Sequence, residues 1–324
     1  MVCLGDIDVN FKWGNISKTT VVRRDANLEM LKIKAIDLWE DALLPIDFEL
    51  KNCSGDASLT DETCADFLRN GNCKIKIESC AVGFSKIKRS NVLVWAGVNE
   101  IVYDDSYFED NILDVENEKI KYILDHVERH IQYTDGVYGP IVRCLEASVR
   151  EYIGVVLLAC AMIAGEITMS AEKSICGKRA NGPLDYVMLY KKFFLLITEA
   201  KKDDMLAGIT QNLAQLVASR EQYLYNEAPV LRKRTYMDMA GQIARIPSTG
   251  IVTSGKDWIL LRYLQRDDGG FYAVGSNMLT IDVGAQDPKI IEEGLIKVIS
   301  KITGAINLQK DAFDSAQENS RQRT

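Results

Sequence analysis

Two carboxylates and a lysine stand at the ends of two consecutive hydrophobic segments. Asp185 lies near the start of GPLDYVMLY (182–190), and thirteen residues separate it from Glu199, which belongs to TEAK (198–201). Glu199 and Lys201 are two residues apart, so on a strand both side chains project from the same face. Mg²⁺ prefers one or two carboxylates together with water and substrate oxygens. The spacing therefore predicts a metal-assisted hydrolytic site.

This combination of residues suits hydrolysis of a phosphodiester bond. A metal held by Asp185 and Glu199 can polarise the phosphate, lower the pKa of a bound water and stabilise the leaving oxygen. Lys201 can orient or deprotonate that water, or neutralise the developing negative charge. Gln211 and Gln215 lie one turn apart on the helix that the next segment predicts. An amide there can hydrogen-bond water or phosphate without adding charge.

The hydrophobic pattern predicts the elements that position these residues. Strands over 184–190 and 193–198 are joined by a turn at 191–192, and a helix over 206–225 follows. An apolar helix over 141–165 is expected to be central in its domain, because its second half is apolar all round. The other predicted elements are a helix from about 118 with a break at 135–136, a short helix or turn over 166–180, strands over 250–253, 258–264 and 270–274, and a helix over 290–306.

The first 79 residues predict a separate small module. Alternation over 6–24 predicts a β-hairpin with its turn near Gly14–Asn15, and a helix begins after Asn27. Strands over 46–50 and 74–77 flank a short helical turn. This β-β-α-β-(short α)-β order is similar to the ubiquitin-like roll and its PB1-type relatives. The resemblance implies an exposed sheet face that recruits a protein partner.

The motif D-x13-E-A-K followed by Q-x3-Q resembles the PD-(D/E)XK nuclease superfamily. More closely, GPLDYVMLY…FFLLITEAKKDDMLAGITQNLAQL (182–216) is similar to the nuclease-like C-terminal domain of Crinkler-type effectors. In those proteins a ubiquitin-like header domain precedes a variable enzyme-like domain. The resemblance implies an α/β (α+β) protein, with a ubiquitin-like N-terminal module followed by a PD-(D/E)XK restriction-endonuclease-like domain that has a mixed sheet flanked by helices.

The resemblance assigns a role to each matching residue. Asp185 and Glu199 would be ligands of Mg²⁺ or Mn²⁺, and the backbone carbonyl of Ala200 would face the same metal. Lys201 would be the catalytic lysine, with Gln215 beside it on the following helix. Nucleic-acid contacts are assigned to Lys202, Gln211 and the cluster Arg232, Lys233 and Arg234, since phosphates are commonly bound by lysine and arginine. The basic cluster has an equal alternative as a solvated surface or a weak nuclear-import patch.

Many members of this superfamily add a glutamate from a helix before the first core strand. Four residues are candidates: Glu146, Glu151, Glu166 and Glu172. The first two lie on polar parts of the apolar helix, and Glu172 lies close to the first predicted core strand. We favour Glu146 as the additional metal ligand.

The predicted organisation has four parts: a ubiquitin-like module (PB1-like or header-like) over 1–79, an acidic linker or connecting segment over 80–124, a PD-(D/E)XK nuclease-like domain over 125–308, and a flexible tail over 309–324. Within the connecting segment, NVLVWAGV (91–98) is predicted to be a strand. The acidic stretch 103–118 is predicted to be a linker or an exposed helix.

The sequence leaves two functions open. The first is a metal-dependent nuclease that acts on nucleic acid, with DNA favoured as substrate. The alternative is a catalytically degenerate domain that binds nucleic acid or protein, while the N-terminal module recruits a partner. A nucleotide-dependent enzyme is the weakest interpretation. It rests on GIVTSGK (250–256), but Asp257 follows where a phosphate-binding loop needs Ser or Thr, and 258–264 is a predicted strand. A turn between two strands explains this segment better.

Composition excludes several other classes. The net charge is −7, with the acidic excess in residues 1–124, which excludes a strongly basic nucleic-acid binder. The longest apolar run, 155–164, has ten residues, about half of what a membrane span needs, so no membrane partner is expected. Eight cysteines without CxxC spacing and only two histidines, His126 and His130, do not predict a zinc site. We expect free thiols and surface histidines.

The start of the chain bears on localisation. MVCLGDIDVN carries two acids and no apolar signal segment. We therefore expect an intracellular protein of the cytoplasm or nucleus. The resemblance to effectors adds an alternative, in which the protein is secreted and delivered into a host cell by a leaderless route.

Overall fold

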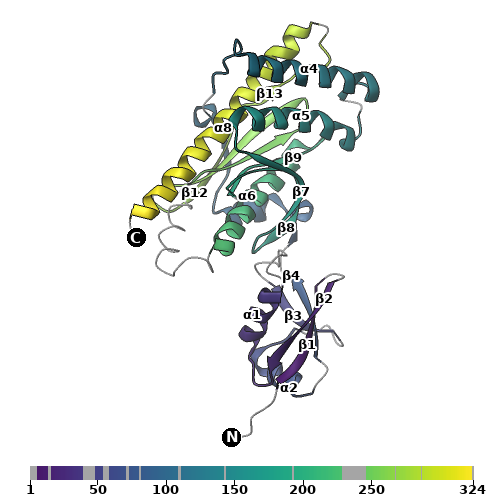
Figure 1. The fold of residues 1–324 in the computed structure, drawn as a ribbon, viewed down its shortest axis with the longest axis vertical. Helices are drawn as coiled ribbons and strands as arrows, with labels where there is room; N and C mark the ends of the chain where they lie inside the picture. Colours follow the sequence, from purple (N-terminus) through teal and green to yellow (C-terminus); the bar gives the residue numbers. More distant parts are fainter. Residues whose placement is uncertain are drawn as a thin grey trace. The chain divides into compact units, whose positions relative to one another are not determined.

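The computed structural model shows a mixed α/β protein of the α+β kind. It describes residues 6–13, 16–38, 48–53, 58–70, 73–79, 82–108, 111–141, 144–191, 193–227, 246–266, 268–285 and 287–322. The chain divides into a smaller unit, Met1–Val82 with Cys176–Asn181, and a larger unit, Gly83–Ile175 with Gly182–Thr324 (Figure 1). Each unit has its own hydrophobic core. The predicted turn at Gly14–Asn15 lies outside the described residues.

The smaller unit is a four-stranded sheet with two helices. Its elements are β1 (Asp6–Trp13), β2 (Ile16–Arg23), α1 (Leu28–Leu38), β3 (Phe48–Asn52), α2 (Asp61–Arg69) and β4 (Cys73–Ser79). The strand order is β2-β1-β4-β3, with β1 antiparallel to β2 and parallel to β4. Val9, Phe11 and Ile75 are fully buried beneath the helices' apolar residues. The predicted order of strands and helices is observed.

The remaining elements build one large sheet and its helices. In chain order they are β5 (Val82–Gly83), the 3₁₀ turn η1 (Phe84–Lys86), α3 (Arg89–Ala96), β6 (Ile101–Tyr103), η2 (Asp105–Tyr107), α4 (Glu118–Tyr138), α5 (Glu146–Ala164), β7 (Thr168–Cys176), β8 (Ala180–Tyr190), β9 (Phe193–Ala200), α6 (Met205–Glu227), β10 (Ser248–Thr253), β11 (Asp257–Gln265), β12 (Phe271–Gly275), β13 (Leu279–Thr280) and α8 (Pro288–Gln322).

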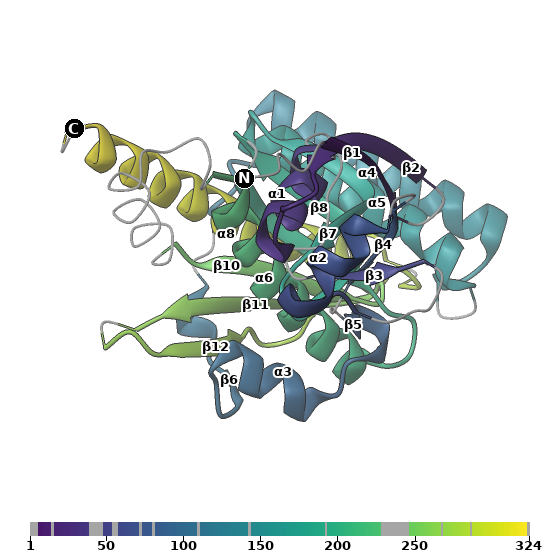
Figure 2. The same cartoon turned by 90° about the horizontal axis from the view of Figure 1, so that it is seen from below.

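The large sheet is mixed, and β9 lies in its interior. The order is β5-β8-β9-β10-β11-β12-β6, with β7 paired to β8 and β13 to β11. Figure 2 shows β10, β11 and β12 side by side. All eight residues of β9 are buried, as expected for a strand covered on both faces. The helix α6 packs against β9 and β10, whereas α5 and α8 contact each other and β9.

The helix α5 is a core helix. It is the one helix among the described residues that is long and apolar enough to cross a membrane. Half of its most apolar window is nevertheless buried inside the protein. It packs against α4, α8 and β9. This placement agrees with the prediction of a central helix and suggests no membrane partner.

Three local predictions are wrong. The segment 91–98 is not a strand, because α3 covers it and Gly97 ends that helix with a left-handed φ of +68°. Its buried residues, Val92 and Ala96, are four apart and so follow a helical period. The segment 166–180 holds β7 rather than a short helix. The helix α4 continues through 135–136 to Tyr138.

The segment 80–124 does more than connect two domains. Its α3 and β6 belong to the larger unit, and β6 adds a parallel strand to β12 through the pair Val102–Val274. The predicted turn at 254–256 is observed between β10 and β11, where Ser254 N–H donates to the carbonyl of Asp257 at 3.0 Å. Gly255 takes a φ of +83° there. No helix follows, so the phosphate-binding-loop interpretation is excluded.

The predicted flexible tail is also wrong over the part that the structure describes, because α8 runs on to Gln322. Phe313 is only 1% exposed, and its ring stacks on Phe193 with a centroid distance of 4.9 Å. Asp314 accepts hydrogen bonds from the Tyr190 hydroxyl and the Lys191 ammonium, both at 2.8 Å. This helix therefore braces the turn between β8 and β9.

We predict that Phe313→Ala destabilises the protein by about 3–5 kcal/mol, the usual cost of deleting a buried aromatic ring. Urea unfolding measures the change. The control is Asp311→Ala, at an exposed position two residues earlier, which should shift stability by no more than about 0.5 kcal/mol. Equal stability of the two variants would mean that the helix end does not pack on the sheet.

Candidate active site

The pairing of β8 with β9 decides which side chains meet. Near the turn, Tyr190 pairs with Phe193, but beyond a bulge between Met188 and Leu189 the register shifts by one, and Tyr186 pairs with Thr198. Continued by one residue, this register puts Asp185 opposite Glu199. Directly opposed residues of an antiparallel pair share a face of the sheet. The bulge therefore brings the two predicted carboxylates together.

Asp185 is fixed by two hydrogen bonds. Its Oδ2 accepts from the backbone N–H of Ala200 at 2.8 Å. Its Oδ1 accepts from Nη2 of Arg150, on α5, at 2.7 Å. The side chain is 14% exposed, so a carboxylate charge here needs these partners. Ala200, whose carbonyl was predicted to face the metal, thus contacts Asp185 through its backbone N–H.

Glu199 is nearly inaccessible and has a partner at each oxygen. Its side chain is 3% exposed, and Oε1 lies 2.8 Å from Nζ of Lys201. Oε2 accepts from Nε2 of the buried Gln215 at 2.6 Å. Lys201 itself is 24% exposed, so its ammonium joins a buried carboxylate to the surface. The predicted set of Asp185, Glu199, Lys201 and Gln215 is therefore assembled in one place.

Asn212, which the sequence analysis missed, positions the helix α6 against β9. Its Nδ2 donates to the carbonyl of Ile197 at 3.0 Å and lies 3.3 Å from Oε1 of Gln215. It is fully buried. In the sequence Asn212 stands beside the polar residues Thr210 and Gln211, so nothing in the local pattern distinguishes it as buried. Among the described interactions, Gln211 makes no hydrogen bond to these side chains, and it is half-buried.

Two glycines leave room for the site. A Cβ on Gly208 would lie 2.8 Å from Cγ of Lys201, and a Cβ on Gly250 would lie 1.8 Å from Oδ1 of Asn212. Neither distance is compatible with a side chain. The backbones of α6 and β10 therefore approach the site residues as closely as glycine allows.

Two of the four candidate glutamates reach the site through Arg150. Glu146 Oε1 lies 3.2 Å from Nη2 of Arg150, and Glu172 Oε1 lies 3.7 Å from Nη1. Glu172 takes a left-handed φ of 53° within β7. Glu151 instead borders a hollow beside His130. The structure thus brings the favoured Glu146 near Asp185 and offers Glu172 as a second choice, whereas Glu166 lies in the turn after α5.

Burial governs the ionisation of the carboxylates. It raises the pKa of Asp185, although the Ala200 N–H and the Arg150 charge oppose the change. Burial also raises the pKa of Glu199, and the charge of Asp185 adds to this effect. For Lys201, burial favours the neutral amine, but the hydrogen bond and charge of Glu199 prevail and raise its pKa. The lysine is therefore charged at neutral pH.

The donor set fits a hard divalent cation in type. Carboxylate oxygens are the ligands that Mg²⁺ and Mn²⁺ prefer. Within the described part of the chain, no group of three or more His, Cys, Asp or Glu side chains is arranged to hold a metal. Every oxygen of Asp185 and Glu199 already has a donor. A cation at this site would need to replace some of them.

The predicted nucleic-acid contacts are placed only in part. Lys202 is half-buried in the turn between β9 and α6, next to the site. Arg232, Lys233 and Arg234 lie outside the described residues.

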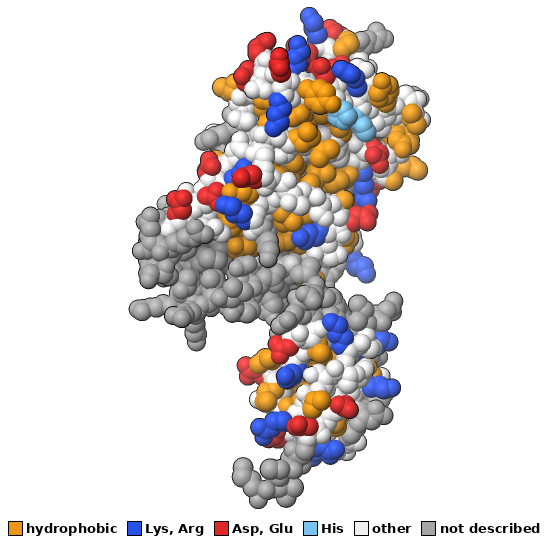
Figure 3. All heavy atoms as spheres, viewed as in Figure 1, with side chains coloured by type: hydrophobic (Ala, Val, Ile, Leu, Met, Phe, Trp, Pro, Cys, Tyr) orange, Lys and Arg blue, Asp and Glu red, His pale blue; other side chains and the backbone are white. Residues whose placement is uncertain are grey.

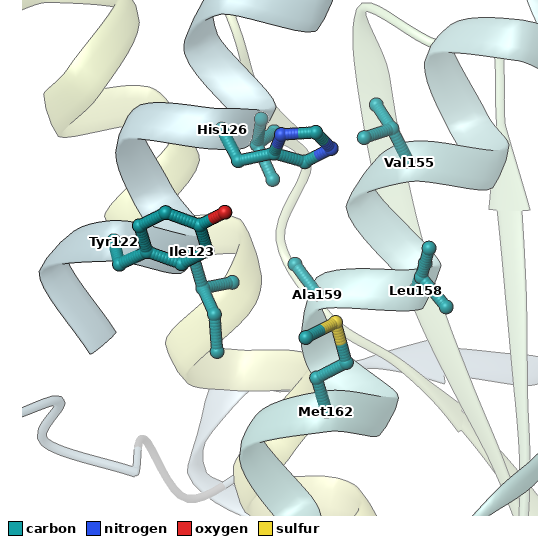
Figure 4. Close-up of a pocket in the computed structure, with 8 residues that line it drawn as sticks. Tyr122, Ile123, His126, Val155, Leu158, Ala159 and Met162 are labelled. Atoms are coloured by element: carbon teal, nitrogen blue, oxygen red, sulfur yellow. The ribbon is translucent and has the colours of Figure 1, made fainter. Parts of the chain in front are cut away.

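An apolar hollow lies apart from these residues, between α4 and α5 (Figure 4). It measures about 30 Å³ and is lined mostly by hydrophobic side chains, with Tyr122 and His126 from α4 and Leu158 and Met162 from α5. Figure 3 shows hydrophobic and histidine side chains gathered on this face. His126 is exposed, as predicted. The hollow is too small for a nucleotide and carries no carboxylate.

Comparison of the chain with models of known protein families and with curated proteins finds no match. The geometry of the site carries the functional argument.

We predict that Gly250→Ala costs about 1–3 kcal/mol of stability, as overpacking does in a filled core. The new methyl group must displace Asn212, so the cost should shrink by at least about 1 kcal/mol when Asn212→Ala is introduced first. A double-mutant cycle of urea unfolding measures this coupling. Gly136→Ala, at an exposed position of α4 where a Cβ meets nothing within 4 Å, is the control, and it should gain up to about 1 kcal/mol because alanine favours a helix more than glycine does. Additive costs in the cycle would contradict the contact.

The raised carboxyl pKa values predict a pH dependence. Between about pH 4, the ordinary carboxyl pKa, and the raised values, the unfolded carboxyls are ionised while the folded ones keep protons. The folded state then binds more protons, so stability falls as pH rises through this interval. We expect the fall in wild type relative to Asp185→Asn/Glu199→Gln, measured by urea unfolding in EDTA. A relative gain in stability with pH would show that Arg150 and Lys201 outweigh burial.

Proposed function

We propose that the larger unit is a metal-dependent phosphodiesterase, a nuclease of the PD-(D/E)XK type, with DNA as the favoured substrate and Mg²⁺ or Mn²⁺ as cofactor. The observation that carries the proposal is the meeting of Asp185, Glu199 and Lys201 on neighbouring strands, with Gln215 bonded to Glu199. A buried glutamate paired with a partly exposed lysine, beside a second carboxylate that is mostly shielded from solvent, is costly for a purely structural role. Such costs are characteristic of functional sites.

The order of elements supports the same family. The helix α5, strands β7, β8 and β9, helix α6 and strand β10 follow one another along the chain. Asp185 comes from β8, Glu199 from the next strand and Gln215 from the helix after it, as the resemblance implies. The preceding helix α5 supplies Glu146, in the place where the superfamily often adds a glutamate.

In this proposal Asp185 and Glu199 hold the metal, with Glu146 or Glu172 beside it. Bound there, the metal would polarise the phosphate and lower the pKa of a bound water. Lys201 is charged and partly exposed, so it donates a hydrogen bond to the phosphate or to the attacking water and neutralises the charge that develops. It is a weaker candidate for the base, because its pKa is raised. The hydrogen bond that Gln215 donates to Oε2 fixes the orientation of the Glu199 side chain.

The smaller unit is proposed to be a ubiquitin-like module that recruits a protein partner. Its parallel β1–β4 pair at the centre of a β2-β1-β4-β3 sheet supports this assignment. Together the two units support the proposal of a Crinkler-type effector, which acts in the cytoplasm or nucleus, whether of its own cell or of a host cell reached by a leaderless route.

A second function is favoured by one observation. The Arg150 guanidinium already neutralises Asp185, and the Lys201 ammonium already neutralises Glu199. A site whose charges are satisfied within the protein is what a catalytically silent binding domain would show. The second candidate is therefore a nucleic-acid- or protein-binding module with a degenerate nuclease site.

We predict that purified protein cleaves DNA in the presence of Mg²⁺ or Mn²⁺, and that Lys201→Ala lowers the rate by about 100-fold or more, the usual effect of removing such a group. Gel assays with DNA and with RNA measure the rate, and circular dichroism checks the fold. Lys297→Ala removes the same charge from an exposed position on α8 and should keep most of the activity. If wild type cleaves neither nucleic acid, the binding module becomes the better assignment.

A further inference from the structure

One guanidinium lies among three carboxylates beside the proposed metal site. Arg150 Nη2 is 2.7 Å from Oδ1 of Asp185 and 3.2 Å from Oε1 of Glu146, and its Nη1 is 3.7 Å from Oε1 of Glu172. The four side chains come from α5, β7 and β8. Carboxylate oxygens are also the ligands that a divalent cation prefers. As they lie around Arg150, the three carboxylates form no metal-binding group within the described residues, but Oδ1 of Asp185, a proposed metal ligand, is occupied by the guanidinium.

The two oxygens of Asp185 differ in what a metal would have to displace. Oδ2 accepts from a backbone N–H, that of Ala200 on a fully buried strand, which cannot move away without breaking the sheet. Oδ1 accepts from a long side chain that is 33% exposed and has room to turn toward solvent. Oδ1 is therefore the oxygen whose present partner a metal can displace, and that partner is Arg150.

One hydrogen-bond donor of the Arg150 side chain is unsatisfied. Its Nε is buried and finds no hydrogen-bond acceptor among the described residues, although a buried donor normally has one. The backbone is fixed, because the Tyr186 hydroxyl donates to the carbonyl of Arg150 at 2.7 Å. Release thus requires only rotation of the side chain, away from a position in which one of its donors is unsatisfied.

We propose that Arg150 competes with the metal for Oδ1 of Asp185 and so sets the metal concentration that the site requires. The inference rests on the proposed metal site but does not require that the site cleave anything. A guanidinium and a divalent cation on one carboxylate oxygen repel each other, so each weakens the binding of the other. Binding of metal releases Arg150 to the mouth of the site, and loss of metal lets it return.

The test is a titration of the full chain with MgCl₂ and with MnCl₂, read as the rise in the thermal unfolding midpoint. A ligand that binds only the native state stabilises it by RT ln(1 + [L]/Kd), so the dependence of the midpoint on metal concentration gives Kd, the concentration of half-maximal binding. Arg150→Ala should lower this half-maximal concentration by about tenfold or more, because it removes a charge-assisted bond to the ligand oxygen. Arg150→Lys, which keeps a charge without the planar fork, should fall between Arg150→Ala and wild type.

Two controls make the result specific. Arg129→Ala removes the same charge from an exposed pair with Asp125 on α4 and should leave the half-maximal concentration within about twofold, as screening of surface charge implies. Asp185→Asn should abolish the response in every background. If Arg150→Ala does not fold, the comparison of Arg150→Lys with wild type decides.

The outcomes separate this inference from the proposed function. An unchanged or higher half-maximal concentration in both Arg150 variants overturns the competition, even if wild type binds metal and cleaves DNA. A lowered half-maximal concentration in the Arg150 variants, with no cleavage by wild type, supports the competition and counts against the nuclease. No response to either metal in any variant overturns the inference together with the metal site.

Discussion

The register of the β8–β9 hairpin determines whether Asp185 and Glu199 lie on the same face of the sheet. Near the turn, Tyr190 pairs with Phe193, and that register extended without interruption would set Asp185 opposite Thr198. Glu199 would then project from the other face of the sheet. The bulge adds one residue on β9 and restores the two carboxylates to a common face. The contacts of Arg150, Lys201 and Gln215 all depend on this alignment.

The buried charges are stable because each has a partner on a rigid element. Asp185 is held from α5 and β9, and Glu199 from α6 and the end of β9. Asn212 ties α6 to β9 through a backbone carbonyl, and Gly250 permits that close approach. Each oxygen of Asp185 and Glu199 accepts a hydrogen bond. A ligand of these carboxylates therefore competes with their present partners, and the partly exposed Arg150 and Lys201 are the partners that can move.

Much of this arrangement was predictable from local rules. The two-residue spacing of Glu199 and Lys201 predicts a shared face, and the strand–turn–strand pattern predicts that Asp185 returns alongside them. The helix carrying Gln215 follows from its apolar period. Strand spacing alone cannot show the bulge, because an extra Leu within FFLLI leaves the apolar pattern unbroken. The prediction that the two carboxylates meet is therefore correct, but the bulge that aligns them could not be predicted from the sequence.

Non-local contacts account for what could not be predicted. Arg150 lies 35 residues before its partner Asp185, and no spacing rule connects a helix residue to a strand across the chain. The segment 91–98 holds a short apolar run that is equally typical of a buried strand, but Gly97 and the packing of Val92 and Ala96 make it a helix. The polar composition of 309–324 hides Phe313, whose burial depends on Phe193 more than a hundred residues away.

The brace that α8 places on the β8–β9 turn has a consequence for biosynthesis. A chain emerges from the ribosome amino end first, so every residue of the site is made well before Phe313 and Asp314. Until those residues appear, Tyr190, Lys191 and Phe193 lack the partners that fix the turn. A nascent chain therefore carries the carboxylates before it carries the residues that brace their hairpin. Final fixing of the β8–β9 turn waits for synthesis of the C-terminal part of α8.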